Sequence, residues 1–129
     1  MPNWCENIVR VTGPVERVAE FVEFVKGRTH DDIPSSFCFN KIIPVDPILY
    51  ETNAWHDFCT THWGTKWEPS GESFFITTDT VPDDGYAEWG FYTAWNPPEG
   101  IFEALRSKFS DIDISWFYHE PGLRIAGYL

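Results

Sequence analysis

The chain has 129 residues and a mass of 15.0 kDa, which suits one domain of ordinary size, spanning residues 1–129. Aromatic residues make up 18% of it and seven are tryptophan, too much large apolar surface for a disordered protein. Twenty acidic residues against nine basic ones give a formal charge of −11. A field of that sign repels phosphate, so we expect no direct binding of nucleic acid. The charge suits either plain solubility or a basic partner.

The sequence predicts a cytosolic protein. Its first residues, Met1 to Trp4, lack the charged and apolar regions of a signal peptide. No apolar run approaches the ~20 residues that a membrane helix needs, so we expect no membrane contact. The cysteines, an odd number, are Cys5, Cys38 and Cys59. We expect all three to be reduced and unpaired.

The first part of the chain predicts a strand, a helix and an extended segment. A β-branched run covers Asn7–Thr12 and predicts a strand. Valines then recur at spacings of three and four, which predicts an amphipathic helix over 14–26 that ends at Gly27. Residues 37–43 are expected to be extended.

Residues 45–69 follow an irregular pattern, which we interpret as a Trp-rich insertion in the domain. A short helix is expected over 54–63, because Gly64 is a typical helix terminator.

The last part of the chain predicts a hairpin, a second helix and two strands. A β-rich run over 73–80 leads into a Pro-Asp-Asp-Gly turn and a return strand. The residues expected on one face of the return strand are Ala87, Trp89, Phe91, Thr93 and Trp95. A helix is expected over 98–109, and strands over 112–118 and 123–128.

This order of elements predicts an α+β fold, the ferredoxin-like split βαβ sandwich. Its antiparallel sheet has four to five strands, and both helices lie on one face because crossover connections are right-handed. The residues expected in the core are Val18, Val22, Phe91, Leu105 and Ile114.

Six short segments carry a resemblance to a known family. In chain order they are Met1–Asn7 (M-P-N-W-C-E-N), Thr12–Pro14, Trp63–Trp67 (W-G-T-K-W), Thr93–Pro98 (T-A-W-N-P-P), Tyr118–Gly122 (Y-H-E-P-G) and Ala126–Gly127. Together they resemble the YubB-like family, small proteins of bacteriophages and conjugative plasmids, over nearly the whole chain. The resemblance implies a ferredoxin-like fold and an origin on a mobile element, and it implies no established activity.

No cofactor, metal or catalytic residue is predicted. Three scattered cysteines cannot supply the four thiolates of an iron–sulfur cluster. His56, Cys59 and His62 lie three apart on the expected helix, where two of them could share a metal, but the sequence has no paired C-x₂₋₄-C ligands. A cysteine and a histidine three apart on a helix also rarely reach the geometry of a nucleophile and its base.

The segment Trp63–Trp67 offers two interpretations. Trp63, Lys66 and Trp67 could form an exposed binding platform, or both rings could fold inward and lock the insertion onto the sheet; the burial typical of tryptophan favours the second. Trp95 has the same ambiguity. If Lys66 is a contact, its replacement by alanine should weaken binding and leave stability unchanged.

We interpret the protein as an acidic, non-enzymatic binding module that docks on a basic host protein, such as a defence or nucleic-acid-handling factor. The expected acidic contacts are Glu16, Glu20, Glu23, Asp83 and Asp84. One alternative is a small-ligand-binding protein or an enzyme with its site at the insertion. This alternative predicts a pocket there that contains a Lys or His with a shifted pKa. Another is a homodimer formed through a sheet face or edge.

Overall fold

Strand β1 (Trp4–Thr12) lies at the centre of a five-stranded antiparallel sheet whose strand order is β4-β5-β1-β6-β7. β1 pairs along its length with β5 (Tyr86–Ala94) and β6 (Asp113–Glu120). The edge strands are β4 (Phe74–Ile76) and β7 (Ile125–Tyr128). The N-terminal strand therefore lies between two strands from the C-terminal half of the chain.

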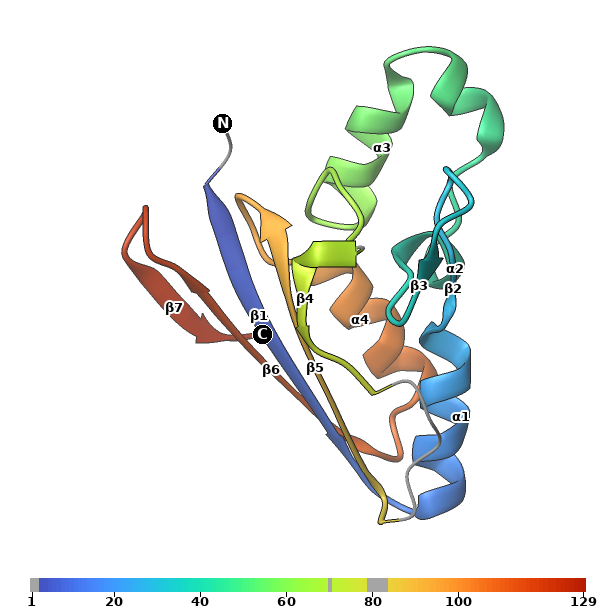
Figure 1. Cartoon of the computed structure of the whole chain (residues 1–129), viewed down its shortest axis with the longest axis vertical. Coiled ribbons are helices and arrows are strands. Elements are labelled where there is room, and N and C mark those ends of the chain that lie inside the picture. The colour runs from blue at the N-terminus through green and yellow to red at the C-terminus, as the bar shows by residue number, and fades with distance from the viewer. Residues whose placement is uncertain (1–2, 70, 79–83) are drawn as a thin grey trace.

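The computed structural model describes residues 3–69, 71–78 and 84–129, and it places helices on one face of this sheet (Figure 1). Helix α1 (Val15–Val25) connects β1 to β4, with β5 between those two strands. Helix α4 (Glu99–Lys108) connects β5 to β6, with β1 between them. This is the split βαβ arrangement that the sequence predicts.

The core fills the space between the helices and the inner face of the sheet. Helix α1 contributes a stripe of four buried residues: Val18, Phe21, Val22 and Val25. Of the five predicted core residues, Val18, Val22, Phe91 and Leu105 are fully buried. Ile114 packs against the core but is only partly buried, because α4 ends at Lys108 and leaves a hollow beside the start of β6.

Four strands differ in extent from the prediction, and one of them, β6, continues to Glu120 instead of ending at 118. β1 begins at Trp4, three residues early, because Trp4 pairs with Ala94 of β5. β4 is short, and residues 79–80 of the predicted strand lie outside the described residues. β7 begins only at Ile125, because Arg124 adopts a φ of +56° in the preceding turn.

The placement of Trp95 on the inner face is wrong. Ala87, Trp89, Phe91 and Thr93 are buried as predicted, whereas Trp95 lies after the end of β5 and is 40% exposed. Its φ of +67° turns the chain out of the strand's alternation, so its side chain leaves that face.

The extended segment predicted over 37–43 is also wrong, because helix α2 (Phe39–Ile42) forms there. The Glu68 carboxylate accepts hydrogen bonds from the backbone N–H groups of Phe39 and Asn40, at the first turn of this helix. Those groups have no partner within a helix, so a carboxylate 28 residues further along the sequence supplies one. A local pattern cannot predict such a contact.

The chain between α1 and β4, called the α1–β4 connection here (residues 26–73), is much longer than the fold requires. It contains β2 (Gly27–Arg28) and β3 (Pro34–Ser35), which form a small hairpin. After α2 come η1 (Pro47–Glu51), α3 (Ala54–His62) and η2 (Gly71–Ser73). The predicted helix over 54–63 is therefore present as α3.

No helix in the described ranges is long and apolar enough to cross a membrane.

Replacement of Leu105 by alanine should lower the free energy of unfolding by about 2–5 kcal/mol, because the side chain is fully buried in the core. Urea unfolding of the purified protein would measure this change. Leu123 is 51% exposed, so Leu123→Ala is the matched control and should change stability little. Equal losses in the two variants would contradict the assignment of the core.

Candidate functional site

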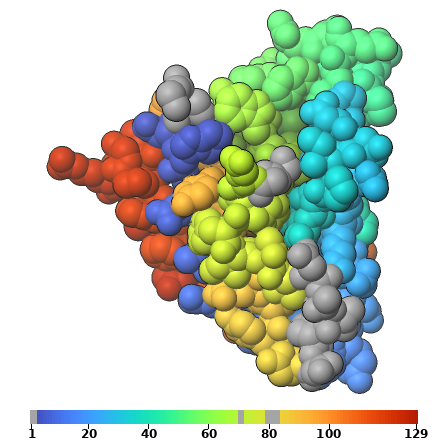
Figure 2. Space-filling model, in the orientation of Figure 1, coloured from blue at the N-terminus to red at the C-terminus, as the bar shows by residue number. Residues whose placement is uncertain are grey.

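A pocket of about 470 Å³ lies between the β2–β3 hairpin and α3, within the α1–β4 connection. The hairpin, in cyan, lies next to α3, in green, at the upper right of the ribbon and of the space-filling view (Figures 1 and 2). We call this cavity the aromatic pocket, because five of the residues that line it carry rings: His30, Tyr50, Trp55, Trp63 and Trp67.

Three of these rings form a stack along one wall of the aromatic pocket. The His30 ring lies parallel to the Tyr50 ring, with 3.6 Å between their centroids. The Tyr50 ring is in turn nearly parallel to that of Trp55, at 6.0 Å. The hairpin, η1 and α3 thus share one aromatic wall, which orders three segments of irregular connection relative to each other.

Trp63 is held rigidly at the base of the pocket. Its indole is buried, its Nε1–H donates to the carbonyl of Ile43 at 2.9 Å, and its ring packs edge-on against Phe39. The backbone carbonyl of Trp63 accepts a hydrogen bond from Gly100 at 3.0 Å. The Trp63 ring therefore folds inward, as the second of the two interpretations of this segment expects.

Two glycines allow α3 to end directly on the start of α4. A Cβ atom on Gly100 would lie 1.7 Å from the carbonyl oxygen of His62, so only glycine permits this approach. Gly64 has a φ of +94°, and a Cβ there would lie 2.8 Å from the backbone nitrogen of Glu99. The pocket is thereby fixed to the main helical layer.

Trp67 departs from the inward interpretation, since it is 40% exposed. Its ring lies 6.1 Å from that of Trp4, at the start of β1, and the Lys66 Nζ lies 4.3 Å from the centroid of the Trp67 ring. An ammonium at that distance makes a cation–π interaction. Trp63, Lys66 and Trp67 thus line one pocket, whereas Trp95 does not line it.

Glu68 supplies a carboxylate to the same pocket. Besides the two α2 amides, it accepts from the Sγ of Cys38 at 3.5 Å. Burial raises the pKa of Glu68 from 4.5 to about 7, although these hydrogen bonds act in the opposite direction. Asp31, in the hairpin turn, adds a second carboxylate to the lining.

The cysteines are poor nucleophiles. All three are free and buried. Burial is the main cause that raises the pKa of Cys5 and of Cys59 to about 11 and that of Cys38 to about 12. The thiols are therefore protonated near neutral pH, and a protonated thiol is neither a good nucleophile nor a good metal ligand.

The weak metal candidates do not converge. Cys59 is buried beside the pocket, whereas His56 and His62 are exposed on α3. Instead, the His56 ring lies 3.8 Å from Asp57 and the His62 ring packs against Phe58. Within residues 3–69, 71–78 and 84–129, no three His, Cys, Asp or Glu side chains are grouped to hold a metal ion.

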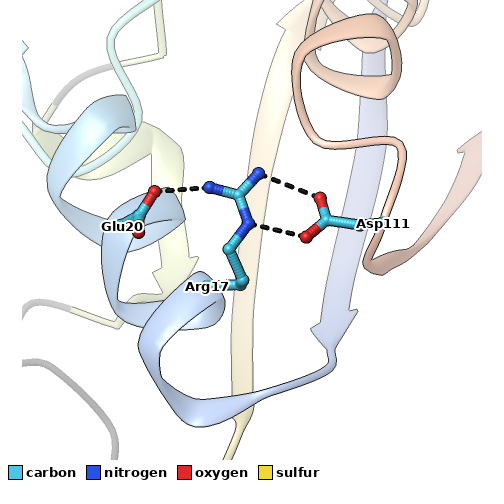
Figure 3. Close-up of polar contacts among 3 residues, drawn as sticks. All are labelled: Arg17, Glu20 and Asp111. Carbon is cyan, nitrogen blue, oxygen red and sulfur yellow. Dashed lines mark hydrogen bonds and ion pairs between the residues drawn. The ribbon is translucent and has the colours of Figure 1, made fainter.

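The predicted acidic contacts Glu16, Glu20 and Glu23 lie on α1, and none of them lines the aromatic pocket. Arg17 bridges Glu20 and Asp111 there (Figure 3), with nitrogen–oxygen distances to Asp111 of 2.7 and 2.9 Å. Lys26 pairs with Glu23 at 3.4 Å. Two of the three glutamates on this helix are therefore partly neutralised by neighbouring bases.

The remaining predicted acidic contacts are Glu16, Asp84 and Asp83. Glu16 and Asp84 are exposed, and Asp83 lies outside the described residues.

The sheet face opposite the helices carries a row of apolar side chains. Phe75 covers Gly90, Gly90 pairs with Ile8, and Ile8 pairs with Phe117. The Phe117 ring contacts Tyr128 at 5.3 Å, and this tyrosine is 69% exposed. The row crosses all five strands.

Sequence reasoning missed the contributions of Tyr50, Trp55, Asp31 and Glu68 to the pocket. The only available signal was the density of aromatic residues in 50–67, which marks the segment but not its partners. The hairpin side of the pocket had no signal, because its position depends on the packing of the connection.

Glu68→Gln should alter how stability depends on pH. A carboxyl with a raised pKa stabilises the fold fully below its unfolded value of 4.5, and this contribution is lost as pH rises through about 7. The free energy of unfolding of the wild type, relative to Glu68→Gln, should therefore fall by about 2–3 kcal/mol between pH 5 and pH 8.

Chemical denaturation at several pH values would measure this difference. Glu72→Gln removes an exposed carboxylate nearby and should show no such trend. A difference between wild type and Glu68→Gln that stays constant with pH would contradict the raised pKa.

Comparison with known proteins agrees with the fold. Residues 73–129 match the family described as the ferredoxin-like domain in Api92-like protein. The chain also resembles the crystal structure of protein Api92 from Yersinia pseudotuberculosis, with a TM-score of 0.62 and 14% sequence identity over 99% of this chain and 93% of that one. No curated protein matches the sequence. The likeness confirms the predicted ferredoxin-like fold, and the aromatic pocket lies in the part of the chain that precedes the matched segment.

Proposed function

We propose that this protein is a non-enzymatic binding module that engages its partner through the aromatic pocket. The observation that carries the proposal is a cavity of about 470 Å³ with aromatic walls, located in the α1–β4 connection. Long irregular segments on a rigid scaffold are disproportionately used for binding. Tryptophan and tyrosine are also the side chains that most often anchor a partner.

The charge of the chain indicates the chemistry of the partner. A formal charge of −11 attracts basic surfaces and speeds their encounter with the protein. The resemblance to YubB-like proteins supports an origin on a phage or plasmid. In that setting the partner is a basic host protein of the bacterial cytoplasm, such as a defence or nucleic-acid-handling factor.

A binding role fits the chemistry of the pocket better than catalysis does. The Cys59 thiol at its edge has a pKa raised to about 11 by burial, so it is not activated as a nucleophile. The alternative of a small-molecule ligand uses the same pocket and the same rings. This alternative anticipates a Lys or His with a shifted pKa, whereas the lining groups whose pKa burial raises are Glu68, Tyr50 and Cys59.

Replacement of Trp67 by alanine should weaken partner binding at least about tenfold, because truncation of an aromatic anchor typically removes that much affinity. The measurement is capture of host proteins on the immobilised protein at low salt, followed by titration of the captured partner. High salt should release it.

Trp95→Ala is the matched control for this experiment. Trp95 and Trp67 are both 40% exposed, but only Trp67 lines the aromatic pocket. The Trp95→Ala protein should bind as the wild type does. The proposal fails if the two variants bind alike.

A second candidate is a homodimer formed through the apolar row on the open sheet face. The row is flanked by the Arg10–Glu88 ion pair and the Glu6–His119 contact, so both signs of charge border it. Such a surface can complement its own copy across a two-fold axis. Sedimentation equilibrium should then show a dimer that Tyr128→Lys dissociates, and a monomer at all concentrations would exclude this candidate.

A further inference from the structure

The aromatic pocket already holds one cation. The Lys66 ammonium lies over the Trp67 ring at 4.3 Å, well inside the ~6 Å within which a ring face attracts a positive charge. The indole rings of Trp55 and Trp63 line the same pocket. The walls of the pocket are therefore suited to a positive charge that has left water.

Carboxylates reinforce this preference. Glu68 and Asp31 line the pocket together with one ammonium, that of Lys66, so the carboxylates outnumber the ammonium. Glu68 is held in place by the α2 amides of Phe39 and Asn40 and cannot swing out to solvent without losing them. Its carboxylate is therefore both fixed and desolvated.

Other ligand classes suit the pocket less well. An anion would meet two carboxylates inside a chain of charge −11. A neutral ring would stack on the walls but would leave the Glu68 carboxylate buried without a counter-ion. A cation satisfies the rings and the carboxylates together.

We propose that the aromatic pocket binds an organic ammonium group, which displaces the Lys66 ammonium from the Trp67 ring and pairs with Glu68 and Asp31. This inference rests on the proposed function of the pocket as the binding site. The ammonium comes either from a lysine side chain on a basic protein partner or from a free small cation. Lys66 then acts as an internal competitor, which reverses the effect that the sequence suggested for its replacement.

The test compares choline with 3,3-dimethylbutan-1-ol, in which carbon replaces the charged nitrogen and the shape is kept. Tryptophan fluorescence and calorimetry on the whole protein at pH 8, above the pKa of about 7 of Glu68, would measure both affinities. Choline should bind at least about tenfold more tightly than the neutral analogue. Equal affinities, or no binding of any cation to the folded protein, would overturn the proposal.

Three variants and one control, Trp95→Ala, assign the contacts. Asp31→Asn, in an exposed turn, and Glu68→Gln should each weaken choline binding roughly threefold to tenfold. Lys66→Met should strengthen it, because the competing charge is removed. Trp95→Ala should leave it unchanged. If Glu68→Gln fails to fold, Asp31→Asn and Lys66→Met still decide the result, and unchanged affinity in both would contradict the proposal.

A lysine-rich peptide and its acetylated form distinguish the two sources of the ammonium. Tighter binding of the peptide than of choline, lost on acetylation, identifies a protein side chain, and the opposite order identifies a small cation. Both orders support the proposal. If a host partner is captured in a Trp67-dependent way but neither cation competes with it, the ligand assignment fails and the proposed function stands.

Discussion

The partly buried carboxylate of Glu68 holds the α1–β4 connection together through its hydrogen bonds. Removing a carboxylate from water is costly, and hydrogen bonds from Phe39, Asn40 and Cys38 offset that cost. The same contacts satisfy the first amides of α2, which explains why a segment with an extended pattern becomes helical. One side chain thus joins α2 to the later part of the connection and also lines the aromatic pocket.

Close packing makes the pocket part of the rigid fold. The end of α3 meets the start of α4 through Gly64 and Gly100, where no other residue would fit without moving the backbone. The hydroxyl of Thr65 donates to the carbonyl of Ala94 at 2.9 Å and fastens the same segment to the end of β5. Binding therefore requires little ordering of the pocket residues in this segment, and a low cost of ordering favours affinity.

Charge acts at two ranges in this protein. The net charge of −11 sets the long-range field that attracts a basic partner and repels phosphate. At short range, ion pairs such as that of Arg17 with Asp111 partly neutralise the negative charge around α1. The carboxylates of Asp31 and Glu68 instead line a cavity of aromatic rings, where screening by water is weaker. Local specificity and general attraction thus have different structural sources.

The ferredoxin-like plan could be predicted from the sequence, because valine spacing in α1 and alternation in β5 are local patterns that bury one face wherever the element packs. The buried positions of Val22 and Phe91 follow directly from those patterns. Three features could not be predicted in this way: the helical state of α2, the outward turn at Trp95, and the assembly of the aromatic pocket. Each of these depends on contacts between residues far apart in the chain, and neither periodicity nor composition encodes which distant group will supply them.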